Sequence, residues 1–377
     1  MIETYDAVVL GVGGVGSAAL FHLASRGLRV LGIDRFLPGH DRGSSHGQTR
    51  LIRQAYHEHP AYVPLVQRAY ALWHELEQIS GQSLYRQVGI LEVGPENGTV
   101  VPGVLASARQ HQLDVEPLDA ARLKRLFPGF CIPGEFAAVF EARAGYLRVE
   151  DCTRAHVGQA LMRGAKLRIG AAVRSWEPAG DAVRLRLDDG EVQAARLVIT
   201  AGAWARDLLA DLRIPLEVVR KPLYWFAAPE ALYGEQNGSP GFIFETPGGN
   251  FYGFPFIAGQ GLKCAEHTGG ATVADPLAVD RQPWPDETRR VEQFLARYLP
   301  QASADATGFA VCLYTLSPDR NFIVDRHPNH PAVCFAAGLS GHGFKFASVL
   351  GEALAEFAAD GRSSLPVGFL SCRRFHE

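Results

Sequence analysis

The chain has 377 residues, of which 47% are hydrophobic and 20% charged, so it can bury a substantial core in two domains or in one interleaved pair. A formal net charge of -3 gives no broad attraction to phosphate or anionic lipid, which excludes nucleic acid as an expected partner. The acidic start "MIETYDAVVLG", the lack of an apolar run near the roughly 20 residues of a membrane helix, and six scattered cysteines favour a cytoplasmic protein that contacts no membrane.

The first 34 residues predict a βαβ unit. A strand over 7–10 is followed by a glycine turn, a helix that ends at Gly27 and a second strand that ends at Asp34. The turn reads Gly11-Val-Gly13-Gly-Val-Gly16, which allows a pyrophosphate to approach the helix N-terminus, and Asp34 can bind ribose hydroxyls. This context indicates dinucleotide binding rather than a purely structural turn, and it fits FAD and NAD equally.

In the middle of the chain, segments that predict helices alternate with segments that predict strands. Apolar residues at helical spacing predict a long amphipathic helix over 62–76, and 85–140 predicts short strands with one polar helical stretch. Residues 151–202 return to a helix, strands and a hairpin, and 216–320 is rich in aromatic strands that suggest a sheet facing a ligand. A Pro-rich turn over 281–287 precedes a helix.

The last segment, 333–360, predicts a strand, a Gly-rich loop and a helix, which repeats the arrangement of the N-terminus. Two histidine-bearing stretches, "YHEHP" and "RHPNH", have no second carboxylate or cysteine at a recognised ligand spacing. The sequence therefore predicts no metal site.

Four further motifs carry a resemblance that extends over nearly the whole chain. They are "GSSHGQTRLIRQAY" (43–56), "YGFPFIAGQGLKCAEHT" (252–268), "AVCLYT" (310–315) and "GLSGHGFKFASVLGE" (338–352). Together with the glycine turn they resemble the family of monomeric sarcosine oxidase and N-methyltryptophan oxidase. The resemblance implies oxidation of a secondary, N-methyl amino acid, transfer of hydride to covalently bound FAD, and reoxidation by O₂ to give hydrogen peroxide, with the imine hydrolysed to an amino acid and formaldehyde.

The resemblance implies that Cys312 carries the flavin. A lone cysteine with apolar neighbours is more often a buried small hydrophobe, and the family motif is what favours attachment. It also places Ser45, Gly341 and Gly343 beside the cofactor.

The cationic residues receive roles from the same resemblance. Arg53 and Lys345 match positions that hold the substrate carboxylate, with Lys345 also beside the cofactor, whereas either residue could instead be solvated or paired with an acid. Lys263 matches the lysine that activates oxygen, where a buried cation would stabilise developing negative charge.

The remaining candidate residues would line the flavin or the substrate. His46, Arg50 and His267 are candidate catalytic residues, and for His267 an orienting role is an equal alternative. Tyr314 and Tyr252 would complete the pocket with hydroxyls and aromatic walls, or would simply pack there.

Two stretches depart from the family pattern. Where members of the family usually read "SHHGDTR", this chain has Ser45 and Gln48, which changes the expected local hydrogen bonding. Phe256 replaces a small residue, and we expect it to narrow the amine side of the pocket.

These features predict an FAD-binding, Rossmann-like α/β domain, made of 1–84, 141–215 and 321–377, interleaved with an antiparallel-sheet substrate domain made of 85–140 and 216–320. We expect a monomer. The alternatives are a flavin dehydrogenase that uses another electron acceptor, a non-catalytic flavin- or amino-acid-binding protein, and an NAD-dependent dehydrogenase, which would need no cysteine attachment.

Overall fold

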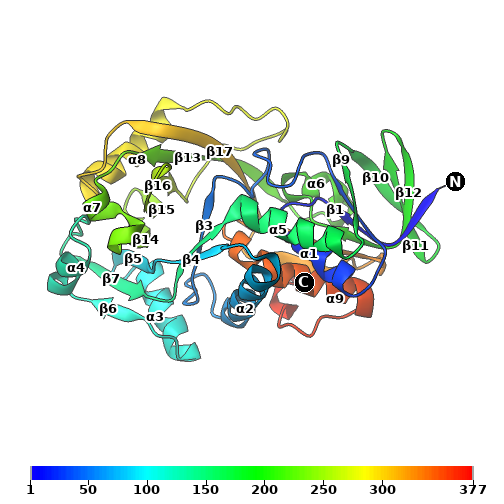
Figure 1. The fold of residues 1–377 in the computed structure, drawn as a ribbon, viewed down its shortest axis with the longest axis horizontal. Coiled ribbons are helices and arrows are strands. Elements are labelled where there is room, and N and C mark those ends of the chain that lie inside the picture. The colour runs from blue at the N-terminus through cyan, green and yellow to red at the C-terminus, as the bar shows by residue number, and fades with distance from the viewer. Residues whose placement is uncertain (1, 376–377) are drawn as a thin grey trace.

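The computed structural model describes residues 2–375 and contains two large sheets that lie toward opposite ends of the long axis (Figure 1). The first sheet has eight strands: β1 Glu3–Leu10, β2 Val30–Asp34, β9 Lys166–Ile169, β10 Val173–Ala179, β11 Ala182–Leu187, β12 Gly190–Ile199, β18 Ile323–Arg326 and β19 Val333–Ala337. Its central strands β9, β2, β1 and β12 are parallel, and β19 also pairs with β12 in parallel. The remaining strands extend the sheet as antiparallel hairpins.

The continuous apolar run in β1 reflects burial on both faces of the sheet. Ala7 and Val9 pack into the core beneath the helices, whereas Val8 and Leu10 pack into a second core on the other face. Helix α1 (Gly14–Ser25) packs between α5 (Val149–Met162) and α9 (Ala347–Asp360). The predicted βαβ unit and the predicted C-terminal strand, loop and helix are confirmed.

Helix α2 (Tyr62–Ser80) lies against α9 and α5 and confirms the long amphipathic helix. Seven apolar residues at helical spacing were used to predict it, and all are buried: Tyr62, Leu65, Val66, Ala69, Leu72, Trp73 and Leu76. The helix ends at Gly81, which adopts a left-handed φ of 68°.

The second sheet also has eight strands: β5 Ile90–Pro95, β6 Glu116–Leu118, β7 Phe136–Glu141, β13 Glu217–Phe226, β14 Gly241–Thr246, β15 Gly249–Ile257, β16 Gly261–Glu266 and β17 Ala306–Leu316. All neighbours are antiparallel except β5 and β14. An aromatic core that includes Phe242, Phe244 and Phe251 lies between this sheet and α8 (Pro285–Tyr298), which stacks Phe294 on Phe251. The end of the predicted Pro-rich turn is the first turn of α8, because proline fits the first helical position.

The segment 85–140 contains two helices where one polar helical stretch was predicted: α3 Val100–His111 and α4 Ala120–Leu126. One more helix is therefore present than was predicted for this segment; the buried residues of α3 include Val100, Val101 and Val104. The short helices α6 (Ala205–Leu208) and α7 (Glu230–Tyr233) complete the set of α-helices in the described residues.

A small third sheet carries residues of the candidate site. It consists of β3 Thr49–Ile52, β8 Gly145–Arg148 and β4 Tyr85–Gln87, in that order. The fold class is therefore confirmed as a Rossmann-like α/β unit interleaved with an antiparallel sheet. The strands of each large sheet fall within the segments predicted for one domain, apart from Glu141 at the end of β7. The domain boundaries themselves stay a prediction.

None of the helices built from residues 2–375 is both long enough and apolar enough to cross a membrane.

Candidate functional site

The predicted glycine turn follows β1 and leads into α1, where its glycines allow close backbone contacts. Gly11 has a φ of 90°, and a Cβ on Gly16 would lie 1.8 Å from the carbonyl oxygen of Gly11. Asp34 at the end of β2 accepts the N–H of Val12 over 2.6 Å. The turn, the helix N-terminus and Asp34 therefore form a compact cradle of the kind that binds a pyrophosphate and a ribose.

A cavity of about 320 Å³ opens onto this cradle. Its lining includes the predicted residues Gly11, Gly13, Asp34, Ser45, Arg50, Tyr314, Gly341 and Gly343. Ser45 Oγ accepts the N–H of Gly14 over 3.2 Å, so the serine that departs from the family pattern caps the start of α1. The cavity lies at the carboxyl ends of the parallel strands, where α/β sheets bind dinucleotides, and its residues fit FAD.

The C-terminal Gly-rich loop closes the far side of this cavity. Gly341 has a φ of 84°, and a Cβ there would lie 2.2 Å from the ring of Tyr314. A Cβ on Gly343 would lie 2.6 Å from Leu339. The loop therefore needs glycine at position 341 to pass this close to β17, and at position 343 to pack against its own residue Leu339.

A smaller cavity of about 70 Å³ adjoins the first and shares Arg50, Tyr314, Gly341 and Phe344 with it. The other predicted residues that line it are Arg53, Tyr252, His267 and Lys345. It is large enough for a small ligand only. The arrangement places a small-molecule site directly beside the cofactor cavity.

Cys312 lies on β17 and is fully buried. Arg50 donates from Nη2 to its sulfur over 2.8 Å, and the sulfur lies 3.3 Å from the carbonyl oxygen of Ser44. Burial opposes ionisation of the thiol, but the charges of His46, Arg50 and Lys263 lower its pKa to about 6. Cys312 is not among the described side chains that line either cavity, whereas its partner Arg50 lines both.

Lys263 lies on β16, and its ammonium group is enclosed by backbone and aromatic rings. It donates to the carbonyl oxygens of Gly47 and Thr49 over 2.5 and 3.0 Å, and lies 4.7 Å from the ring centre of Phe254. Burial and the neighbouring Arg50 charge lower its pKa well below the ordinary value. A residue that sequence statistics would place on the surface is therefore a buried, weakly basic amine close to Arg50 and Cys312.

Arg53 is buried and already paired with acids. Its Nη2 contacts both oxygens of Glu58 at 2.8 and 3.0 Å, and its Nε lies 3.4 Å from Glu92. Lys345 donates to the carbonyl oxygen of His342 over 2.8 Å. Burial and the Arg53 charge lower the pKa of Lys345 to about 7. The sequence left open whether Arg53 is solvated or paired with an acid, and in this structure it is paired with an acid. Arg53 and Lys345 both line the small cavity.

Two tyrosines and one histidine form the aromatic wall of the small cavity. Tyr314 Oη lies 3.4 Å from His267 Nδ1, and the His267 ring meets Tyr252 edge to face. Burial and the nearby Lys221 lower the pKa of His267 to about 3, so its imidazole is neutral. His46 is buried next to Cys312. It is not one of the described residues that line the two cavities.

Phe256 does not narrow the pocket, which corrects the expectation from its sequence. The register between β15 and β16 shifts between Phe254 and Ile257, so Phe256 packs against the aromatic core under α8, whereas Phe254 and Ile257 face the site side of the sheet. Gln48, the other departure, is exposed, and Glu150 accepts its N–H, so an acid from α5 takes part in the local hydrogen bonding.

The sequence analysis missed four polar residues of the small cavity: His57, Glu58, Asn250 and His342. His57 and Glu58 belong to "YHEHP", which was examined only for metal ligands. Their proximity to Arg53 arises from the bend after β3, which no periodic pattern reveals. A usable signal was the single acid Glu92 inside the apolar strand "GILEV", because a buried acid in a strand needs a nearby cation.

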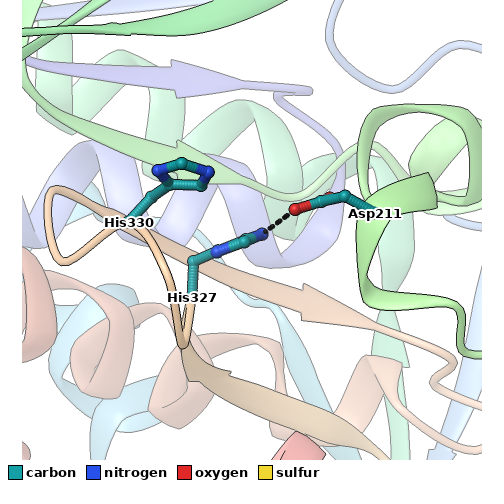
Figure 2. A group of neighbouring side chains, drawn as sticks. All are labelled: Asp211, His327 and His330. Atoms are coloured by element: carbon teal, nitrogen blue, oxygen red, sulfur yellow. Dashed lines mark ion pairs between the residues drawn. The ribbon is translucent and has the colours of Figure 1, made fainter.

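"RHPNH" does meet a carboxylate in space. Figure 2 shows His327 pointing at Asp211, with His330 beside it, and the His327 Nε2 to Asp211 Oδ2 distance is 2.9 Å. Asn329 donates its N–H to His327 Nδ1 over 3.3 Å, which places the imidazole proton on Nε2, facing Asp211. The contact between His327 and Asp211 is a close histidine–carboxylate pair, and the ligand atoms of all three side chains lie within 4.8 Å of one another, so the absence of a metal site stays a prediction.

Comparison with known proteins identifies the family. The model of the family described as FAD dependent oxidoreductase matches residues 6–357. The chain belongs to this family. It is 40% identical over 380 residues to monomeric sarcosine oxidase of Streptomyces avermitilis, with 99% of this chain and 98% of that protein covered. It is also 38% identical over 375 residues to N-methyl-L-tryptophan oxidase of Yersinia pestis, with 98% and 99% covered.

Among solved structures, the chain is similar to NikD, an unusual amino acid oxidase essential for nikkomycin biosynthesis, at 25% identity and a TM-score of 0.86, with 98% of this chain and 97% of that chain covered. The predicted resemblance is confirmed, and the chain is an FAD-dependent oxidoreductase.

Proposed function

We propose that this FAD-dependent oxidoreductase is an amine oxidase that oxidises a secondary, N-methyl amino acid, with O₂ as the electron acceptor and hydrogen peroxide as a product. The imine that forms is hydrolysed to the amino acid and formaldehyde. The observation that carries the proposal is the small cavity, which is lined by Arg53, Lys345 and the neutral imidazole of His267 and adjoins the larger cavity.

The two cations would bind the substrate carboxylate. Lys345 projects from the loop before α9 and Arg53 from the bend after β3, so the carboxylate would be held from two sides. Glu58 occupies the Nη2 edge of Arg53, and the substrate carboxylate therefore has to replace it or bind at the free N–H of Nη1. Binding at these cations would fix the position of the α-nitrogen and the N-methyl group.

His267 and Tyr314 would meet the amine. A neutral His267 can accept a hydrogen bond from the N–H of the amine, and it cannot repel a cationic substrate on entry. Burial of the site favours the uncharged amine, whose lone pair is needed for oxidation. Tyr252 and Tyr314 exclude water from this side of the cavity.

FAD, when bound, supplies the acceptor for hydride. We propose that Cys312 holds it covalently, because the lowered pKa provides a thiolate at neutral pH and Arg50 orients the sulfur. Lys263 would stabilise the negative charge that develops when O₂ is reduced, and its low pKa leaves it able to take up a proton at that moment. We further propose that the enzyme acts as a monomer, which light scattering of the purified protein would test.

A panel of N-methyl amino acids, assayed for peroxide under air and for formaldehyde, tests the function. We expect equal amounts of peroxide, formaldehyde and demethylated amino acid. Rapid reduction of the flavin by these substrates without oxygen consumption would favour the dehydrogenase alternative. No reduction by any secondary amine would refute the proposal.

A further inference from the structure

Glu92 is a carboxyl group in the middle of a sheet. On β5, Leu91 and Val93 face the aromatic core, and Ile90 and Glu92 alternate with them on the opposite face, the side of the candidate site. Glu92 pairs in register with Val139 of β7 and Ile243 of β14, so its strand is internal. The side chain is fully buried, and neither carboxyl oxygen has a hydrogen-bond partner among the described residues.

Arg53 is the nearest charged group to Glu92. The distance from Arg53 Nε to Glu92 Oε1 is 3.4 Å, and the distance from His57 Nδ1 to the same oxygen is 3.9 Å. Arg53 donates from its other nitrogens to Ala55, His57 and Glu58. The guanidinium is therefore held by Glu58 on the cavity side and faces Glu92 on the sheet side.

The other charges around Glu92 come from the bend that carries Arg53 and from two further parts of the chain. Glu58 lies in the bend after β3, Glu141 is at the end of β7, and Lys345 is in the loop before α9. Glu141 accepts the N–H groups of Gln54 and Ala55, which fixes the bend that carries Arg53. Three acids thus surround two cations in a water-excluded space, and that imbalance disfavours a charge on Glu92.

Burial and the negative charges of Glu141 and Glu58 raise the pKa of Glu92 to about 8, against the opposing pull of Arg53. Glu58, by contrast, stays ionised, because Arg53 and His57 hold its pKa well below the usual value although burial opposes this. At neutral pH the guanidinium therefore faces one carboxylate, Glu58, and one uncharged acid.

We propose that Glu92 is a positioning residue that controls the availability of Arg53 to a carboxylate ligand: the protonated acid leaves the guanidinium free to bind the ligand, and the ionised acid retains it. This inference rests on the proposed function, in which Arg53 binds the substrate carboxylate. When Glu92 loses its proton to solvent at alkaline pH, Arg53 faces two carboxylates, and an incoming third has to compete with both.

Acetate binding, followed through the visible absorption of the flavin in the holoenzyme, tests the proposal without turnover. Acetate does not titrate above pH 6, so its dissociation constant reports only the protein. We compare wild type with Glu92→Gln, which keeps shape and polarity but cannot ionise, and with Glu92→Leu. Lys345 titrates in the same range and its pKa responds to the Glu92 charge, so the comparison is repeated in a Lys345→Met background. In that background the ratio of dissociation constants, wild-type Glu92 over variant, isolates Glu92.

We expect this ratio to rise about tenfold between pH 7 and pH 9, because the protonated fraction of a group with a pKa of about 8 falls about tenfold over that range. Glu116→Gln, which removes an exposed acid paired with Arg122 on the edge strand β6, serves as the control and should follow wild type. A ratio that stays constant with pH for both Glu92 variants would overturn the proposal. Flavin content and thermal unfolding of each variant establish that it folds.

Arg53→Met separates the two levels of inference. If this substitution weakens acetate binding and the wild-type to Glu92→Gln ratio is still independent of pH, the role of Glu92 is wrong and the carboxylate site stands. If acetate does not bind, or binds equally to Arg53→Met, the carboxylate site itself is misassigned and the proposal for Glu92 falls with it.

Discussion

Replacing Arg50 should raise the pKa of Cys312 and slow attachment of the flavin. Arg50 Nη2 lies 2.8 Å from the sulfur and is one of three neighbouring groups whose positive charge lowers the thiol pKa from 9.0 to about 6. Three pKa units correspond to about 4 kcal/mol of preference for the thiolate. At pH 7 the thiolate fraction is about 90% with this pKa and about 1% at the ordinary value.

Arg50→Met removes one of these charges, and we expect the pKa of Cys312 to rise by about one unit, which roughly halves the thiolate at pH 7. Arg50→Lys keeps a charge without the planar fork and should cause a smaller rise. The thiolate absorbance near 240 nm is measured from pH 4 to 9 in protein prepared before flavin attachment. Subtraction of the Cys312→Ser curve isolates Cys312.

The other buried thiols do not interfere with this titration, because burial raises the pKa of Cys152, Cys264, Cys334 and Cys372. The rate at which flavin becomes resistant to acid precipitation should fall with the thiolate fraction. A wild-type midpoint near 9, or an unchanged midpoint in Arg50→Met, would refute the electrostatic account of this cysteine.

Four further predictions test the remaining assignments. Cys312→Ala should leave bound flavin extractable by acid, and flavin that stays covalently attached would contradict the proposed link. Lys263→Met should slow reoxidation by O₂ about a hundredfold while anaerobic reduction by substrate is preserved, as separate stopped-flow half-reactions would show. Lys345→Met should raise KM for an N-methyl amino acid at least about tenfold with a smaller change in kcat, because a charged hydrogen bond to the carboxylate is lost. The folded-state pKa of Glu92 is raised from 4.5 to about 8, so folding takes up a proton across this range and wild type should lose about 1.4 kcal/mol of stability per pH unit relative to Glu92→Gln. Denaturant unfolding at pH 5 and pH 7 should show a relative gain for the variant of up to about 3 kcal/mol, and an equal difference at both values would contradict the raised pKa.

Periodic patterns predicted the scaffold well. The Rossmann turn, α2 and the C-terminal strand, loop and helix follow from spacing alone, because burial imposes a period on the sequence. The sequence could not predict which side of the sheet Phe256 faces, since the register shift between Phe254 and Ile257 arises from pairing with β16. Spacing also could not place Asp211 beside His327, because the two lie more than a hundred residues apart in the chain.

The candidate site was reached through motifs, and motifs identify residues better than they identify charge states. The motifs predicted that Arg53, Lys263 and Lys345 are three positively charged residues of the site. In the structure, burial lowers the pKa of both lysines, and only Arg53, which is paired with Glu58, has a firmly held charge. Charge state depends on how much water and how many acids surround a group, and these are properties of the folded chain.

The acids near Arg53 explain why so many ionisable groups can be buried together. A single buried cation would cost several kcal/mol, whereas Arg53 is compensated by Glu58, and Glu92 avoids a similar cost by retaining its proton. An apolar residue at position 92 would stabilise the sheet more than Glu92 does, because the neighbours on β7 and β14 are Val139 and Ile243. Retaining an acid there sacrifices stability above pH 4.5 and places a titratable group 3.4 Å from the arginine that would bind the substrate carboxylate. Residues that suit a site but not their secondary structure are most often found at functional sites, and Glu92, like Lys263 on β16 of the same sheet, is a buried ionisable residue in a strand beside the candidate site.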